Sequence, residues 1–181
     1  GDGTLAELEK ESLRCSGVII DLDNLPRLND AELDSVIVSI RSRMEPGSII
    51  LLSDRVDRVE ELSRRCVDLD LDGMLVDAAS LDGSGATVAL PRIGMASKKS
   101  GLAASGRSIM IRLEGPVSAE TIVISKCAGI DAVVSTDLEG SVDDVDSEIR
   151  AILREMGVTS FSEVNRSNLR AIDHGTAMQT G

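Results

Sequence analysis

The chain has 181 residues, of which 42% are apolar, and this predicts one globular domain with a sizeable core. A net charge of −12 disfavours a nucleic-acid partner, and a single Phe without Trp or Tyr excludes stacking platforms for bases. No apolar run reaches the roughly 18 residues of a membrane span, and the acidic, polar start is unlike a signal peptide, so we expect a cytoplasmic protein with no membrane partner.

Short apolar runs alternate with amphipathic segments along the chain. The first part of the chain is expected to form a strand over residues 17–21, a helix over 29–44, a strand over 48–53, a helix over 54–66 and a strand over 73–79. After these we expect a helix within 92–104, a strand over 108–115, a helix over 118–129, a strand over 131–137 and a helix over 143–157.

Capping residues mark several of these helix ends. Asn29 or Asp30 is the expected N-cap of the first helix, and Ser118 is the expected N-cap of the fourth. A short helix capped by Thr159 or Ser160 is expected near the end of the chain. We therefore divide the chain into an N-terminal helical extension (1–16), a βα-repeat domain (17–158), and a C-terminal short helix and tail (159–181).

Strands that alternate with helices imply right-handed βαβ units and a parallel sheet. Two α/β architectures are compatible with about five such strands, an open doubly wound sheet or part of a (βα)8 barrel. A complete barrel typically takes about 250 residues, so it is excluded.

A glycine-rich stretch, Asp82-Gly83-Ser84-Gly85, follows the third expected strand. Glycine allows the backbone to approach a phosphate closely, and N–H groups at a helix start bind anions. The same residues also suit a plain strand-to-helix turn, so both interpretations stay open.

Four segments, in matching order, resemble the C-terminal half of the FMN-binding (βα)8 barrel of glutamate synthase, in particular its archaeal stand-alone form. Residues 71–88 (LDGMLVDAASLDGSGATV) are similar to that family's GADxIxIxGxxGGTGAAP. The other three similar segments are residues 21–53, 109–137 and 148–173. The resemblance implies a half-barrel fold with about five parallel strands.

The resemblance also implies FMN as the cofactor, with its phosphate held by loops that follow the strands. Gly83 and Gly85 correspond to the family's glycine-rich flavin loop, Gly115 to a glycine of its GGLR loop, and Ser135 to its GTA loop. The candidate cofactor-binding residues are Asp82, Gly83, Ser84, Gly85, Gly115, Ser118, Ser135 and Thr136.

The chain departs from the family at chemically important positions. Glu114 and Val117 replace a glycine and the basic residue of GGLR, and Asp137 adds a carboxylate to the other phosphate loop. The family's lysine is missing from residues 51–53, and residues 138–148 contain no cysteine for a 3Fe-4S centre. We therefore expect no Fe–S cluster and no catalytic residue, and weakened binding of FMN or another phosphate ligand.

Other candidate sites are few. Asp21, Asp23 and Asp77 end strands but match no metal-ligand spacing, so no metal is predicted. His174 lies in the tail and does not suit a general base, and Lys98-Lys99 suits a solvated pair.

Three functions remain open after this comparison. The first is a degenerate glutamate-synthase-related domain that is non-catalytic by itself. The second is a subunit or fragment of an FMN-dependent oxidoreductase that forms glutamate from 2-oxoglutarate and glutamine-derived ammonia, and the third is a small phosphate-binding α/β module. A half-barrel leaves sheet surface uncovered, so we expect a homo-oligomer or a partner subunit that completes the barrel.

Overall fold

The computed structural model describes residues 16–25, 28–79 and 83–168. The strands are β1 (Gly17–Asp21), β2 (Ile49–Arg55), β3 (Gly73–Asp77), β4 (Ser108–Arg112), β5 (Pro116–Val117), β6 (Ala132–Val134) and β7 (Asp137–Leu138). The helices are α2 (Asp30–Arg41), α3 (Val59–Asp68), α4 (Gly83–Ser100), α5 (Ala119–Cys127) and α6 (Val142–Met156), with short 3-10 turns η1 (Val56–Arg58), η2 (Ala103–Ser105), η3 (Phe161–Glu163) and η4 (Arg166–Asn168).

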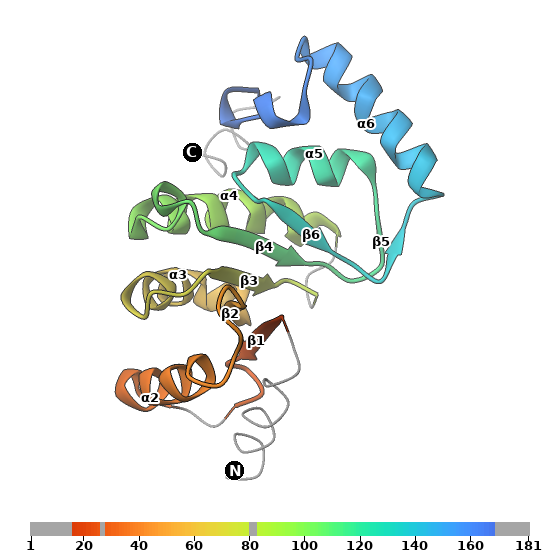
Figure 1. Ribbon diagram of the computed structural model, residues 1–181. Helices are drawn as coiled ribbons and strands as arrows, with labels where there is room; N and C mark the ends of the chain where they lie inside the picture. Colours follow the sequence, from red (N-terminus) through yellow and green to blue (C-terminus); the bar gives the residue numbers. More distant parts are fainter. Residues whose placement is uncertain (1–15, 26–27, 80–82, 169–181) are drawn as a thin grey trace.

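The main sheet has five parallel strands in the order β1-β2-β3-β4-β6. Within this sheet the strands stand in the order in which they occur in the chain, without the reversal of order that defines a doubly wound sheet. The α/β fold expected from the sequence is confirmed, and the sheet order is that of a half-barrel. Figure 1 shows α2, α3, α4 and α5 stacked in the same order as the strands.

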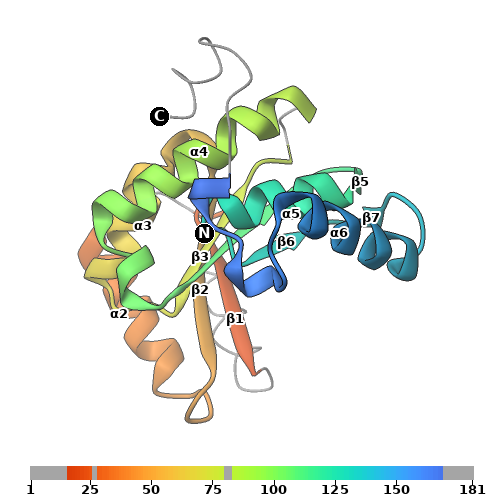
Figure 2. The same ribbon diagram turned by 90° about the horizontal axis from the view of Figure 1, so that it is seen from above.

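One face of the sheet packs against the helices because right-handed crossovers between strands in sequential order place every helix on the same side. Ile20, Leu52, Met74 and Ile109 are paired across β1 to β4 and belong to one buried cluster with helix residues. That cluster includes Leu33, Ile37 and Ile40 of α2, Leu62 and Cys66 of α3, and Leu90 and Ile93 of α4. Figure 2 shows α2, α3 and α4 on one side of β1, β2 and β3.

The opposite face, which we call the inner face, carries the alternate residues of each strand. Its centre is buried, with Leu51 6% and Leu75 1% exposed. Its margins are open, since Ile19 is 45%, Ile49 51% and Val134 39% exposed. The inner face thus has an apolar, buried centre and incompletely covered margins.

The C-terminal part packs on α5 through a second, smaller cluster. Val123 and Cys127 of α5 contact Leu153 of α6 and Val164, which follows η3. Asn29, Ser118 and Ser160 act as N-caps, as expected, and Gly157 ends α6 with φ of +72°. Among the described residues, no helix is both long and apolar enough to cross a membrane.

Two of the differences from the sequence prediction bear on the candidate site. Helix α4 begins at Gly83 and ends at Ser100, so it is longer than the expected helix within residues 92–104. The expected fifth strand over residues 131–137 is divided, because β6 ends at Val134 and β7 forms a separate two-stranded ladder with β5. Both differences lie at the carboxyl ends of the strands.

Candidate functional site

The candidate residues lie in segments that follow β3, β4 and β6. These three strands are neighbours and parallel, so the segments after them meet at one edge of the sheet. Gly83 and Gly85 belong to the first turn of α4, together with Ser84, so the stretch expected as a loop is a helix start. Asp82 lies outside the described residues.

Gly115 and Ser135 are brought together across this carboxyl edge. Gly115 has φ of +79°, which favours glycine, and its carbonyl oxygen accepts a hydrogen bond of 2.5 Å from Ser135 Oγ. The same hydroxyl accepts a hydrogen bond of 3.3 Å from the backbone N–H of Asp137. The two predicted phosphate loops are therefore bonded directly to each other.

Backbone pairing strengthens this connection between the loops. Pro116 pairs with Asp137 and Val117 with Leu138 in the β5–β7 ladder. The backbone N–H of Glu139 also donates to the carbonyl oxygen of Val117 at 3.1 Å. Backbone polar groups that could face a phosphate thus form hydrogen bonds within the chain.

Ser118 caps α5 rather than presenting a free hydroxyl. Its Oγ accepts a hydrogen bond of 3.2 Å from the backbone N–H of Thr121 and lies 3.0 Å from Thr121 Oγ1. Glu120 adds a carboxylate to the same first turn. Carboxylates stabilise a helix start, and here the negative charge opposes binding of a further anion.

A pocket of about 360 Å³ lies beside these loops. Its apolar walls are Val117, Ile122, Val133 and Leu138, and its polar lining is Ser135, Thr136 and Asp137. Asp137 is the one charged residue among those that line it, so the pocket has the size for a small ligand and a charge that disfavours a phosphate.

A charged row crosses the inner face at the carboxyl edge. Arg55, Asp77 and Arg112 are paired residues of β2, β3 and β4. Arg112 Nη1 donates to Asp77 Oδ2 at 3.0 Å, and both side chains are partly exposed. Neither arginine was predicted as a site residue from the sequence, although a charged residue at the end of an apolar strand is a usable signal for this edge.

Two further polar residues of β2 are buried near the carboxyl edge. Ser53 lies on the inner face with 0% exposure, and within the described part of the chain its hydroxyl has no hydrogen-bond partner. Asp54, which is 5% exposed, points to the helix face and accepts hydrogen bonds from the backbone of Arg55 and from Arg58 Nη1. Burial raises the pKa of the Asp54 carboxyl, and those two partners partly offset the rise.

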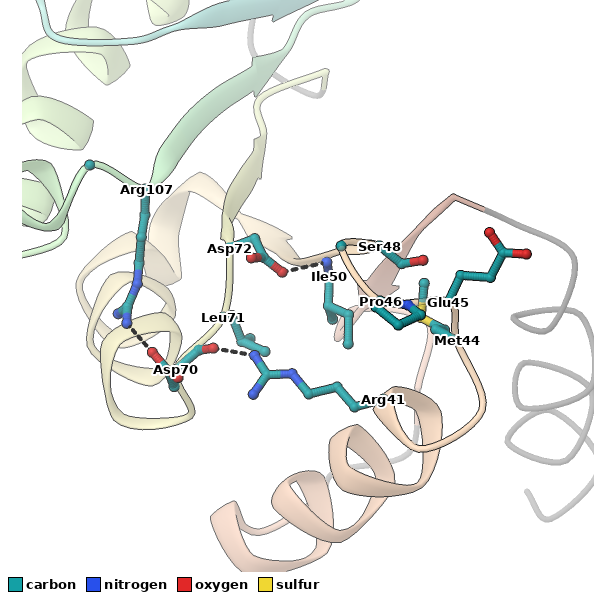
Figure 3. A pocket seen from close by; sticks show the side chains of 12 residues that line it. Arg41, Met44, Glu45, Pro46, Ser48, Ile50, Asp70, Leu71, Asp72 and Arg107 are labelled. Carbon is teal, nitrogen blue, oxygen red and sulfur yellow. Dashed lines mark hydrogen bonds and ion pairs between the residues drawn. The ribbon is translucent and has the colours of Figure 1, made fainter.

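A larger pocket of about 540 Å³ lies at the amino ends of the strands (Figure 3). There Arg41 donates to the carbonyl oxygen of Asp70, and Arg107 donates to the Asp70 carboxylate and to the carbonyl of Cys66. Asp70 has φ of +51°, so the two arginines hold a turn that is otherwise unfavourable. These contacts support a stabilising role at the end of the half-barrel away from the candidate site.

Metal-binding and thiol chemistry have little support in the described residues. None of them form a group of three or more His, Cys, Asp or Glu side chains that could hold a metal ion. Cys66 and Cys127 are buried and unpaired by disulfides, and burial raises the pKa of Cys66 to about 12. His174 lies outside the described residues.

The comparisons with known proteins leave the family undetermined. A scan against protein-family models gives no match, and a search of curated proteins gives no relative.

Proposed function

We propose that this chain is a glutamate-synthase-related half-barrel domain that is non-catalytic by itself and acts within an assembly. The observation that carries the proposal is the sequential order of the five parallel strands, with the helices on one face. A sheet of this kind in a barrel continues at both edges, and here β1 and β6 are the end strands of the described sheet.

The hydrogen bonds made by the polar groups of the carboxyl edge support the proposal that the chain is non-catalytic by itself. Asp77 is bonded to Arg112, and Ser135 is bonded to Gly115. A catalytic carboxylate or hydroxyl needs to reach a substrate, and these groups already satisfy each other. The purified chain with added FMN should form no glutamate from 2-oxoglutarate and glutamine, and turnover would contradict this part of the proposal.

Self-association through the margins of the inner face is the form of assembly that we test. Ile19 of β1 and Ile49 of β2 are diagonal neighbours on the inner face near the β1 edge, and both are about half exposed. Light scattering coupled to gel filtration should show a dimer or larger species. Ile19→Lys should shift it to monomer, while Val38→Lys, at an exposed apolar position of α2, should leave it unchanged. A monomeric parent protein at high micromolar concentration would contradict self-association.

A second function, binding of FMN or a related phosphate ligand, is favoured by the 360 Å³ pocket at the carboxyl edge. Asp137 should weaken such binding, so Asp137→Asn should tighten FMN binding severalfold in a fluorescence titration. Asparagine can still accept the 2.9 Å hydrogen bond from the backbone of Leu138. Asp143→Asn, an exposed change of equal charge in α6, is the control. No binding by the parent or by Asp137→Asn would contradict this function.

A further inference from the structure

The pocket of about 360 Å³ at the carboxyl edge borders β6, an end strand of the described sheet. Val133 of β6 is paired with the core residue Ile111, so it lies on the helix face of the sheet. Ile122 and Leu138 also line the pocket and, like Val133, are partly buried against the main core cluster. The pocket thus has an apolar wall continuous with the core, which suits the apolar part of a small ligand.

The polar lining of this pocket has hydrogen-bonding capacity that the described chain does not use. Asp137 Oδ1 accepts a bond of 2.9 Å from the backbone N–H of Leu138, and among the described residues the other carboxylate oxygen has no partner. The hydroxyl of Thr136 also lacks a partner among these residues, whereas that of Ser135 is bonded to Gly115. A carboxylate oxygen and a hydroxyl oxygen are therefore available beside the apolar wall.

The charge around the pocket is negative. Asp137 is the one charged residue among those that line it. Glu120 lies in the first turn of α5, where its full negative charge exceeds the half positive charge of the helix start. Glu139 is exposed, and its backbone N–H is bonded to the carbonyl oxygen of Val117, which lines the pocket. All three side chains therefore favour a cation at this position.

The basic residues of the surrounding elements are bonded elsewhere or lie at a distance. Lys126, the basic residue of α5, has its Nζ 3.6 Å from Asp131 Oδ1. Arg112 of β4 is bonded to Asp77 and lies on the inner face, away from the helix face. Strands β5, β6 and β7 contain no basic residue, and the first arginine of α6 is two turns beyond its start. The charge of Asp137 is thus not neutralised by these elements.

We infer that this pocket binds a primary ammonium group attached to a small apolar body. The ammonium group has three N–H donors, of which Asp137 and Thr136 accept two and solvent the third, since both side chains are exposed. An exposed ion pair contributes little alone, so burial of the apolar body against Ile122, Val133 and Leu138 supplies the rest. The inference uses the pocket of the second proposed function but gives it a ligand of opposite charge, and it does not rest on the assembly.

The test is a titration of the full chain with 2-phenylethylamine, 2-phenylethanol and 3-phenylpropanoate, followed by amide NMR shifts. The three ligands share a ring and a short chain and differ in charge, and the amine is protonated at pH 7 as lysine is. The amine should bind most tightly and shift the amides of Ile122, Val133 and Leu138. Asp137→Asn should weaken its binding about fivefold and leave 2-phenylethanol unaffected.

The matched control is Asp34→Asn, an exposed change of equal charge on α2, which lies at the other end of the sheet (Figure 1). It should change the affinity for the amine less than about twofold. An equal loss with Asp34→Asn would overturn the inference, because it would indicate diffuse attraction to an acidic protein. Thermal unfolding of each variant verifies that it is folded.

Two further results would overturn the inference. One is no shift of these amides at about 20 mM amine, a concentration at which even weak sites are occupied. The other is equal affinity for 2-phenylethanol or 3-phenylpropanoate, which would remove the preference for a cation. Failure of the phosphate function is distinguishable, because Asp137→Asn should tighten FMN binding and weaken amine binding.

Discussion

Ser135 Oγ donates a hydrogen bond of 2.5 Å to the carbonyl oxygen of Gly115, and so joins the loops that follow β6 and β4. The resemblance to glutamate synthase implies that these residues lie on two loops that would hold a phosphate between them. In the structure the hydroxyl is committed to the other loop, and the β5–β7 ladder extends the same connection. The residues that indicated a phosphate site are therefore hydrogen-bonded to each other.

Removing this hydroxyl should weaken the connection between the loops. We expect Ser135→Ala to lower the free energy of unfolding by about 1 kcal/mol, because a partly buried carbonyl loses its partner. Urea unfolding followed by circular dichroism measures the change. Thr136→Ala is the control, since Thr136 is exposed and should give a change below about 0.5 kcal/mol. Equal effects of both variants would show that the Ser135 bond contributes nothing.

Gly94→Ala should destabilise the protein even though alanine favours helix by about 1 kcal/mol over glycine. The added Cβ would lie 2.4 Å from the carbonyl oxygen of Ala128, which is backbone and cannot move aside easily. We expect a loss of about 1–3 kcal/mol in urea unfolding. Met95→Ala, at the next and exposed position, should change stability by less than about 0.5 kcal/mol. A gain in stability by Gly94→Ala would contradict the close contact.

Cys66 should be unreactive in the folded protein. It is 0% exposed, and burial raises the pKa of its thiol to about 12. At pH 8 roughly one molecule in ten thousand carries the reactive thiolate. Iodoacetamide should therefore leave Cys66 unmodified in native protein and modify it fully in guanidinium chloride, as measured by peptide mass spectrometry. Equally fast modification of native protein would show that Cys66 is accessible.

Asp54→Asn should stabilise the protein at neutral pH. Because burial raises the pKa of Asp54, the folded state binds a proton more tightly than the unfolded state, and stability falls as pH rises from the unfolded pKa through the folded pKa. Asparagine removes that loss and can still accept the hydrogen bond from the Arg55 backbone. The melting temperature of Asp54→Asn should exceed that of the parent at pH 7.

The difference in melting temperature should shrink below about pH 4, where the unfolded carboxyl is also protonated. Asp57→Asn provides the control, because Asp57 is exposed and pairs with Arg55 at the surface. A lower melting temperature for Asp54→Asn at pH 7 would mean that the ion pair with Arg58 outweighs the cost of burial.

Elements with strong local signals were predicted accurately. Strand β1 has the expected bounds, and α6 differs from the expected helix by one residue at each end. Asn29 and Ser118 cap their helices as expected, because capping depends on a few adjacent residues. Periodicity and caps are local properties, so a single sequence contains them.

Elements that depend on distant partners were predicted only in part or were not predicted. The glycines and Pro91 disfavour helix locally, so the first part of α4 is not predicted from the sequence. Packing of Leu90 and Ile93 into the core overrides this local preference. The β5–β7 ladder joins segments about 20 residues apart, and each strand has only two residues. Arg112 donates a hydrogen bond to Asp77 on the neighbouring strand. Periodicity within one strand does not identify such a partner.

Local patterns in the sequence predict the α/β class, the number of main strands and the N-caps Asn29, Ser118 and Ser160, because apolar periodicity and capping act over a few residues. Only the tertiary structure decided the sequential strand order, the bond between Ser135 and Gly115, and the meeting of Ile122, Val133 and Asp137 at one pocket. These relationships arise when crossovers of the same handedness bring distant segments side by side. The local sequence around each residue does not indicate which distant segment it will contact.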